Sequence, residues 1–547
     1  MLRITELKLP LDHTEAELKT AIAAYLSIAE ADINHFSVFK RSFDARKGHM
    51  LLAYIIDLDV GALESKLLAQ FKNNVHVLAT PDTRYHFVGQ APATFTNSAQ
   101  RPIVVGFGPC GIFAALILAQ MGFKPIVLER GKKVRERTQD TWGLWRKSTL
   151  NPESNVQFGE GGAGTFSDGK LYSQIKDPRH LGRKVLNEFV KAGAPDEILY
   201  IAKPHIGTFK LVGMVEKMRA EIESLGGEIR FQQRVDDLIL EDTPDGNKQI
   251  RGVRVTEIGV EGQPSNEILS EHVVIALGHS ARDSFEMMHH RGVFMEAKPF
   301  SVGFRIEHPQ SLIDQARWGK YAGHPVLGAA DYKLVHHAAN GRAVYSFCMC
   351  PGGTVVAATS EVGRVVTNGM SQYSRNERNA NSGMVVSINP SDYPGGAMAG
   401  IEFQRQLESQ AYVLGGENYN APAQLVGDFL AGRASNSVGA VEPSYKPGVN
   451  WTDLAAALPD YAITAMREAL PAFGKKIRGY DMHDAVLTGV ETRTSSPLRI
   501  TRGDDCQSLN VRGLYPAGEG AGYAGGILSA GVDGIKVAEA LALDILK

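Results

Sequence analysis

The chain has 547 residues, of which 44% are apolar and 22% are charged, so we expect a folded globular protein of about three or four domains and exclude a disordered chain. Lys and Arg number 58 against 60 Asp and Glu, and this near balance gives no reason to expect a nucleic-acid partner or an anionic membrane surface. Four cysteines are too few for a disulfide framework, and the charged N-terminus lacks the apolar core of a signal peptide, so we expect a soluble cytoplasmic protein.

Residues 1–90 are expected to form a small ferredoxin-like α+β module. The spacing of apolar side chains predicts helices at residues 15–26 and 63–71. Apolar or alternating runs predict strands at residues 3–11, 35–43, 50–60 and 75–79. The order strand, helix, strand, strand, helix, strand is that of a split βαβ unit. This module could dock a partner protein, and we interpret residues 91–100, which are mostly small and polar, as a linker.

A dinucleotide-binding fingerprint follows the linker. Gly106-Phe-Gly108-Pro-Cys-Gly111 is a G-x-G-x-x-G that comes directly after the apolar run 103–105 and opens an apolar helix. A second strand then ends at Glu129, 18 residues after Gly111. This arrangement is typical of a unit that binds a pyrophosphate at a helix N-terminus and a ribose at an acidic side chain.

Each part of the fingerprint has its own physical task. Gly106 permits the tight turn, Gly108 lets a pyrophosphate approach the backbone, and Gly111 lets the helix pack closely against the strand. Glu129 should accept hydrogen bonds from the adenosine ribose, and its charge disfavours the 2′-phosphate of NADP. The phosphate turn also includes Pro109 and Cys110.

A glycine-rich segment near the C-terminus favours FAD over NAD. Residues 514–520 predict a strand that ends in Gly518-Glu519-Gly520, and Gly525-Gly526-Ile527 opens the last helix. FAD enzymes with an N-terminal Rossmann unit return in this way, with a carboxylate at the ribityl chain and a helix N-terminus at the flavin ring. The expected fold class is therefore α/β. A Rossmann-like FAD-binding domain would comprise residues 101–298 and 481–547, and residues 299–480 would form an inserted α+β substrate lobe.

Five segments, spread over about residues 95–547, together resemble a known family. They are GFGPCG with Glu129-Arg130, residues 159–171, HVVIALGHSARD, GVETRTSSPLRI and LYPAGEGAGYAGGI. They are similar to the bacterial FAD-dependent dehydrogenases of unassigned substrate, within the glutathione-reductase-like flavoproteins that include p-hydroxybenzoate hydroxylase and geranylgeranyl reductase. The family's late Gly-Asp is Gly518-Glu519 here, which keeps the charge and adds one methylene. The resemblance implies further residues at the cofactor, namely Arg130, Gly161, Gly162, Gly164, Ser167, Lys170, Val235 and Gly278.

No motif identifies the catalytic residues. Cys348 and Cys350 lie two apart on a predicted strand and would point the same way, either as a flavin-linked redox pair or as small packing residues. Arg493 could bind a substrate carboxylate or a flavin phosphate, or be satisfied within its loop. His279 follows Gly278 and would lie near the cofactor. No metal-ligand spacing is present.

The predicted function is an FAD-dependent oxidoreductase that transfers hydride between flavin N5 and a small organic substrate. There is no second G-x-G-x-x-G after a strand, so NADH or NADPH, if used, would be a transient reductant. Two alternatives stay open: a flavin monooxygenase, and a non-enzymatic flavin-binding scaffold whose N-terminal module docks a partner.

Overall fold

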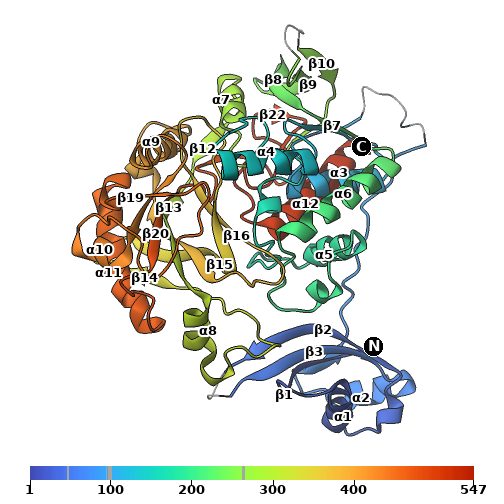
Figure 1. Ribbon diagram of the computed structural model, residues 1–547. Helices are drawn as coiled ribbons and strands as arrows, with labels where there is room; N and C mark the ends of the chain where they lie inside the picture. Colours follow the sequence, from blue (N-terminus) through green and yellow to red (C-terminus); the bar gives the residue numbers. More distant parts are fainter. Residues whose placement is uncertain (46–48, 94, 96–100, 261–264) are drawn as a thin grey trace. The chain divides into compact units, whose positions relative to one another are not determined.

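A computed structural model describes residues 1–45, 49–93, 95, 101–260 and 265–547. The chain divides into an N-terminal unit, made of residues 1–86 and 170–205, and a main unit, made of residues 87–169 and 206–547 (Figure 1). The predicted α/β class with a parallel sheet is confirmed. Most of the predicted linker lies outside the described residues. Within the described ranges, no helix is long and apolar enough to cross a membrane.

The N-terminal unit contains an antiparallel sheet in the strand order β2-β3-β1-β4. Its first helix begins at a capping box in which Thr14 and Glu17 satisfy each other's backbone N–H groups. The elements in chain order are β1 (Leu2–Pro10), α1 (Glu15–Leu26), β2 (His35–Asp44), β3 (Leu51–Asp59), α2 (Glu64–Gln70) and β4 (Val77–Ala79).

Residues 170–205 belong to the N-terminal unit, although the sequence analysis places them in the FAD-binding domain. The guanidinium of Arg183, on helix α5 (Leu181–Lys191), lies 4.9 Å from the ring centroid of Phe39 on β2. The backbone of Arg41 on β2 hydrogen-bonds Tyr200 O and Ala202 N. The first unit is therefore built from two separate stretches of chain.

The main unit contains a five-stranded sheet in the order β23-β11-β5-β6-β7, in which all neighbouring strands are parallel. Its central strand reads Ile-Val-Val and is buried throughout, as expected for a parallel strand covered on both faces. The strands are β5 (Ile103–Val105), β6 (Ile126–Glu129), β7 (Glu228–Phe231), β11 (Val273–Ile275) and β23 (Leu514–Pro516).

Helix α3 (Pro109–Gln120) contacts two neighbouring helices, α6 (Thr208–Ser224) and α12 (Ile527–Ile545) (Figure 1). Every residue from Cys110 to Ala119 is buried, which explains why this helix is apolar on all sides. The main unit also contains the helices α4 (Val134–Lys147), which contacts α6, and α7 (Arg282–His290).

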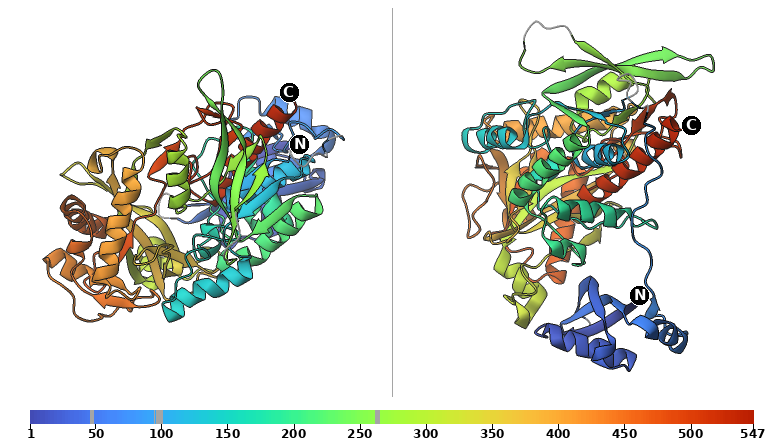
Figure 2. Two further views of the ribbon diagram at one scale, coloured as in Figure 1. Left: turned by 90° about the horizontal axis from the view of Figure 1, so that it is seen from above. Right: turned by 90° about the vertical axis from the view of Figure 1, so that its right-hand side faces the viewer.

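A twisted meander extends from this layer and appears in green in Figure 2. It pairs β8 (Gln233–Asp242), β9 (Lys248–Glu257), β10 (Asn266–Leu269) and β22 (Val511–Arg512). The strands β12 (Met295–Ala297) and β21 (Leu498–Ile500) form a separate, short antiparallel pair.

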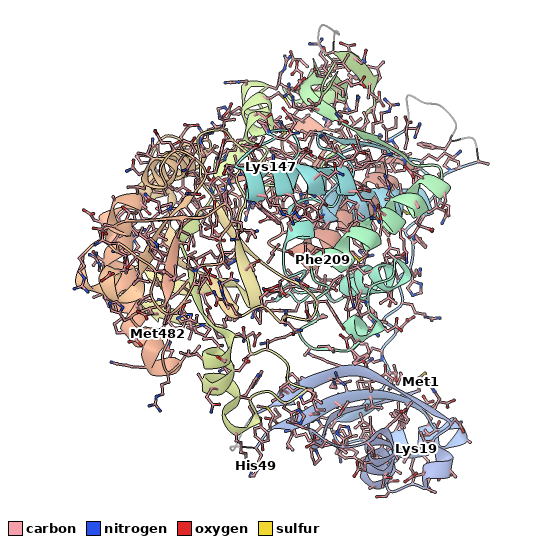
Figure 3. The ribbon with its side chains drawn as sticks, in the orientation of Figure 1. Met1, Lys19, His49, Lys147, Phe209 and Met482 are labelled. Carbon is pink, nitrogen blue, oxygen red and sulfur yellow. The ribbon has the colours of Figure 1, made fainter. Side chains whose placement is uncertain are left out.

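The second large sheet has eight strands, and its long strand β15 (Ala343–Ala357) pairs with three neighbours. Side chains fill the space around this sheet and form the largest apolar cluster of the unit (Figure 3). Its other strands are β13 (Phe300–Pro309), β14 (Val335–His337), β16 (Thr367–Ser371), β17 (Asn379–Ile388), β18 (Ala421–Leu425), β19 (Val449–Trp451) and β20 (Val486–Glu491). The helices of this part are α8 (Gln310–Trp318), α9 (Ala399–Leu414), α10 (Val426–Ala431) and α11 (Asp460–Lys476).

Candidate functional site

The predicted phosphate turn lies at the carboxyl end of β5 and is closed by glycine packing. Gly106 has φ +100°, a region that glycine adopts without strain. A methyl group at Gly111 would lie 1.9 Å from the carbonyl oxygen of Gly106. Pro109 occupies the first position of α3, and Gly108 at its N-cap supplies no side-chain acceptor. The turn therefore presents bare backbone at the start of a buried helix.

Glu129, at the end of β6, ties the turn to two neighbouring segments. Its carboxylate accepts hydrogen bonds from the backbone N–H groups of Phe107 (2.9 Å), Gly131 (2.8 Å) and Gly159 (2.9 Å). A carboxylate has about four acceptor positions. This residue thus has a structural task that the sequence analysis does not anticipate, beside the ribose contact predicted for it.

The second glycine segment, residues 159–164, packs directly on the first. The N–H of Gly161 donates to Phe107 O at 2.8 Å. A methyl group at Gly162 would lie 2.8 Å from the Cα of Gly108, and one at Gly164 would lie 3.0 Å from Ile527 at the start of α12. The two segments and the two helix starts are therefore in contact.

Arg137 on α4 shapes the approach to this second segment. Its guanidinium is fully buried and donates to the carbonyl oxygens of Asn155 (2.8 Å), Val156 (2.6 Å) and Glu160 (2.7 Å). Burial lowers the pKa of Arg137 to about 10, so the side chain stays charged at neutral pH. Sequence reasoning missed this residue, because nothing in an amphipathic helix marks one arginine as buried.

The late glycine segment meets the early one, as expected from the likeness of its strand and glycine loop to those of FAD enzymes. A methyl group at Gly518 would lie 2.9 Å from the Cβ of Cys110. The N–H of Gly520 donates to Leu277 O at 3.1 Å. His279 Nδ1 lies 3.0 Å from Glu519 Oε1, so two residues predicted separately form one pair. We call residues 106–111, 159–164, 518–520 and 525–527 the glycine cradle.

The residues of the glycine cradle fit a dinucleotide cofactor. Methyl groups at Gly278, Gly525 or Gly526 would meet no atom within 4 Å, so these backbones face open space. In the described residues, neither α3 nor α12 has a side-chain cap at its N-terminus. Two helix starts with bare N–H groups beside exposed glycine backbone suit the phosphates and ring of an anionic cofactor.

The other predicted cofactor residues occupy varied positions. Ser167 Oγ donates to Gly164 O at 2.7 Å, which braces the second segment. Arg130 forms ion pairs with Glu153 and Asp283, so its guanidinium is engaged by protein groups. Val235 is buried in β8, where it pairs with Val255. Lys170 falls in the N-terminal unit and bridges to His205.

Cys348 and Cys350 lie on β15 as thiols. From the sequence, the two thiols are expected to point the same way along a strand; here the pairing register breaks between Phe347 and Cys350, and Cys348 has φ +44°. Cys350 is fully buried, and Arg305 donates to Cys348 O at 3.0 Å. Whether the pair is redox active stays a prediction.

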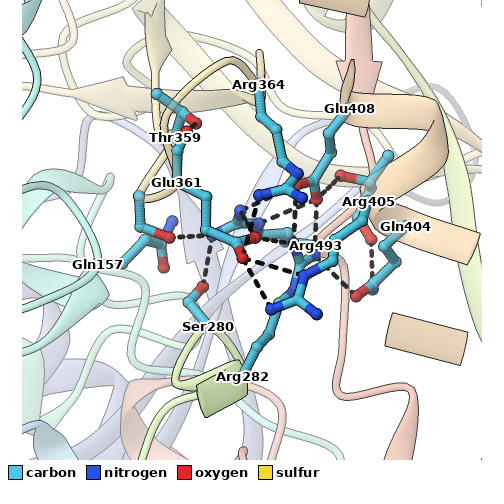
Figure 4. Close-up of polar contacts among 12 residues, drawn as sticks. Gln157, Ser280, Arg282, Thr359, Glu361, Arg364, Gln404, Arg405, Glu408 and Arg493 are labelled. Atoms are coloured by element: carbon cyan, nitrogen blue, oxygen red, sulfur yellow. Dashed lines mark hydrogen bonds and ion pairs between the residues drawn. The ribbon is translucent and has the colours of Figure 1, made fainter. Parts of the chain in front are cut away.

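Arg493 lies in a buried polar network, shown in Figure 4. Its Nη1 donates to Ser280 Oγ (2.9 Å) and Ser360 Oγ (2.7 Å), and its Nε and Nη2 bind both oxygens of Glu408. This guanidinium is engaged by protein groups, the arrangement of a satisfied loop that the sequence analysis weighed against substrate binding. We call Arg282, Glu361, Gln404, Glu408 and Arg493 the buried ion cluster.

A cavity of about 500 Å³ lies elsewhere in the main unit. Its lining includes His272 and Gly513, which precede β11 and β23. These are the amino ends of parallel strands, whereas the glycine cradle follows their carboxyl ends. Ligands of open parallel sheets bind at the carboxyl ends, so this cavity is not the candidate site.

Comparison with known proteins agrees with a flavin site. The family described as "FAD-dependent protein, C-terminal domain-like" matches residues 299–494, and a domain of unknown function, DUF8436, matches residues 1–59. An uncharacterized protein from Clostridium beijerinckii is 46% identical over 556 residues, which cover 98% of each chain.

Several solved structures show a weaker likeness. L-proline dehydrogenase from P. horikoshii is 12% identical, with 81% of this chain and 94% of that chain covered and a TM-score of 0.33. Glycine oxidase from Bacillus cereus is 12% identical, with 81% and 95% covered and a TM-score of 0.34.

The parallel sheet, the fingerprint turn and the family model that matches residues 299–494 define the class of FAD-dependent proteins. The chain and its clostridial relative belong to one family, and residues 299–494 of the chain match the model of FAD-dependent proteins.

Proposed function

We propose that this protein is a dehydrogenase or reductase that holds one FAD in the glycine cradle and transfers hydride to or from a small organic substrate. The observation that carries the proposal is the meeting of the early and late glycine segments at the starts of α3 and α12. When bound, FAD supplies hydride acceptance and donation at its N5 atom.

The chain's own groups would bind and orient the cofactor. The N–H groups at the start of α3 would face the phosphates. Glu129 would hold the turn through the N–H of Phe107 and would accept hydrogen bonds from the ribose. The start of α12 would direct its partial positive charge at the flavin ring, which favours the negative charge that reduction brings.

His279 is the side chain best placed to move a proton. Glu519 lies at its Nδ1 and favours the tautomer that carries a proton there, so Nε2 is left as the acceptor. In this proposal His279 takes or gives the proton that accompanies hydride transfer from an alcohol or amine.

The test begins with the purified protein. We expect a yellow protein that releases FAD on heating, and a colourless protein without flavin contradicts the proposal. Anaerobic titration with NADH, then NADPH, then a panel of hydroxy and amino acids, follows flavin absorbance near 450 nm. Bleaching by a nucleotide alone identifies a reductase, and bleaching only by a metabolite identifies a dehydrogenase. Hydroxylated product on mixing with oxygen would instead identify a monooxygenase.

A variant separates the role of His279 from binding. We expect His279→Gln to keep its FAD content while the rate of flavin reduction falls about a hundredfold. Unchanged rates in this variant would remove His279 from the mechanism.

A further inference from the structure

We infer that Glu408, on helix α9 of the matched C-terminal domain-like region, is a positioning residue for the FAD site. This inference rests on the proposed function. Glu408 lies outside the glycine cradle and was not singled out by any sequence motif. It acts through Arg282 and Arg493, which hold the segments that border the cradle.

Glu408 is the centre of the buried ion cluster. Its Oε1 accepts from Arg282 Nη2 (2.8 Å), Thr492 Oγ1 (2.8 Å) and Arg493 Nε (3.1 Å). Its Oε2 accepts from Arg282 Nη1 (2.9 Å) and Arg493 Nη2 (3.0 Å). These five hydrogen bonds saturate the acceptor positions of the carboxylate. The dashed contacts in Figure 4 converge on this group and on Glu361.

Three members of the cluster, Arg282, Glu408 and Arg493, are charged groups in the interior. Glu408 is 0% exposed, and Arg282 and Arg493 are 1% and 8% exposed. Burial by itself would raise the pKa of the Glu408 carboxyl. The two guanidinium groups lower this pKa by more than burial raises it, so it lies well below its usual range. Removing the charge of Glu408 would leave two buried cations with only Glu361 beside them.

The first connection to the cradle runs through the turn after β11. Arg493 donates to Ser280 Oγ at 2.9 Å, and Arg282 begins helix α7 two residues further on. Gly278 and His279 directly precede Ser280, and His279 pairs with Glu519. Glu408 thus holds Ser280, through Arg493, and Arg282 directly, and these residues follow the proposed proton-transfer residue His279 in the chain.

The second connection runs through the strand end after β20. Gln404, one turn before Glu408 on α9, donates to Thr492 O at 2.9 Å. Further along this segment, Ser496 Oγ donates to Gly520 O at 2.9 Å. The late glycine segment is therefore braced by the same stretch of chain that Glu408 anchors.

The third connection runs through the loop after β15. Arg493 donates to Ser360 Oγ at 2.7 Å, and Gln157 Nε2 donates to Ala358 O at 3.0 Å. Gln157 lies two residues before Gly159 at the start of the second glycine segment. Three of the segments that border the proposed cofactor site are thus linked to one carboxylate.

The test compares the variant Glu408→Gln with the control Glu402→Gln. Glu402 lies on the same helix, its side chain is 59% exposed, and it binds Arg405. We expect the FAD dissociation constant, measured by flavin fluorescence on the apoprotein, to rise at least about tenfold in Glu408→Gln and to change less than about twofold in Glu402→Gln. Equal dissociation constants in wild type and Glu408→Gln would overturn the inference.

A second pair keeps the test decisive if Glu408→Gln does not fold. Ser280→Ala and Ser360→Ala each remove one hydroxyl acceptor of the same Arg493 nitrogen. We expect each variant to bind FAD more weakly than wild type and to have an altered flavin absorption spectrum. FAD affinity and spectrum equal to those of wild type in both variants would contradict the inference.

The failure of this inference is distinguishable from the failure of the proposed function. Wild-type protein that does not bind FAD removes the proposed function. Wild-type protein that binds FAD together with a Glu408→Gln variant that binds it equally well removes only the role of Glu408.

Discussion

The glycine cradle and the buried ion cluster stabilise the same region of the main unit by opposite means. In the cradle, close approach depends on missing side chains, since methyl groups at several glycines would overlap backbone atoms. In the cluster, long charged side chains from α7, α9 and the segment after β20 meet in the interior.

This difference teaches which changes each region tolerates. The cradle should lose stability when a side-chain atom is added at a closely packed glycine, because the neighbouring backbone atoms have no room to move. A cluster fails when an atom or a charge is removed, because the remaining buried charges lose their partners. Four predictions separate these two modes, from the largest expected effect to the smallest.

Adding one methyl group to the cradle should have the largest effect. Gly111→Ala places a Cβ 1.9 Å from Gly106 O, whereas Gly213 in α6 has no atom within 4 Å of its Cβ position. We expect Gly111→Ala to lower the free energy of unfolding by about 3 kcal/mol or more and to abolish FAD binding. Gly213→Ala should raise it by about 0.5 to 1 kcal/mol. Urea unfolding measures both, and equal effects would contradict the packing argument.

The pKa of a buried carboxyl should depend on the number of guanidinium groups beside it. Glu408 has two, whereas Glu491 has only Arg305, at 3.2 Å, and burial raises its pKa to about 7. A raised pKa in the folded state stabilises the protein below about pH 4.5, and this contribution is lost as the pH rises through 7.

We therefore expect the stability of Glu491→Gln relative to wild type to increase by on the order of 2 kcal/mol between pH 5 and pH 8. Unfolding free energies at several pH values measure this difference. The buried His308, whose pKa is lowered to about 4 by burial, is present in both proteins and cancels. A difference that does not change with pH would show that Glu491 stays charged in the folded state.

Glu129 accepts hydrogen bonds from two segments of the cradle, and replacing it tests how much this acceptor contributes to the stability of the fold. Glu129→Gln keeps the size of the side chain but places an NH₂ group where the carboxylate accepts backbone N–H groups. We expect a loss of about 2 kcal/mol in unfolding free energy. Glu271→Gln, at an exposed carboxylate, is the matched control. Equal stability of the two variants would mean that water replaces the lost acceptor.

An exposed ion pair of the same main unit should have the smallest effect. Arg378 and Glu442 form a salt bridge with side chains that are 57% and 70% exposed. We expect Arg378→Ala to change the unfolding free energy by less than about 0.5 kcal/mol. A loss as large as that of a cluster variant would show that burial is not what distinguishes the cluster.

Sequence reasoning was most successful where local patterns carry the physics. The fingerprint predicted the turn at Gly106 and the apolar helix α3, because a strand, a tight turn and a buried helix each require particular residues in adjacent positions.

Sequence reasoning failed where contacts join distant residues. Nothing in residues 170–205 indicates that they complete the N-terminal unit, because α5 is an ordinary amphipathic helix that could cover any apolar face. Likewise, the partners of Arg493 lie 85 and 133 positions away, so its pairing with Glu408 and Ser360 could not be predicted.

The sequence by itself determined where two glycine segments and an acidic strand end lie, and it predicts that they serve a dinucleotide cofactor. These features follow from backbone geometry, which each short segment carries with it. Only the tertiary structure decided that Glu129 would secure three backbone segments, that His279 would pair with Glu519, and that a carboxylate on α9 would hold the surroundings of the site. Such contacts are set by how the sheets and helices pack, and packing brings together side chains whose positions in the chain are unrelated.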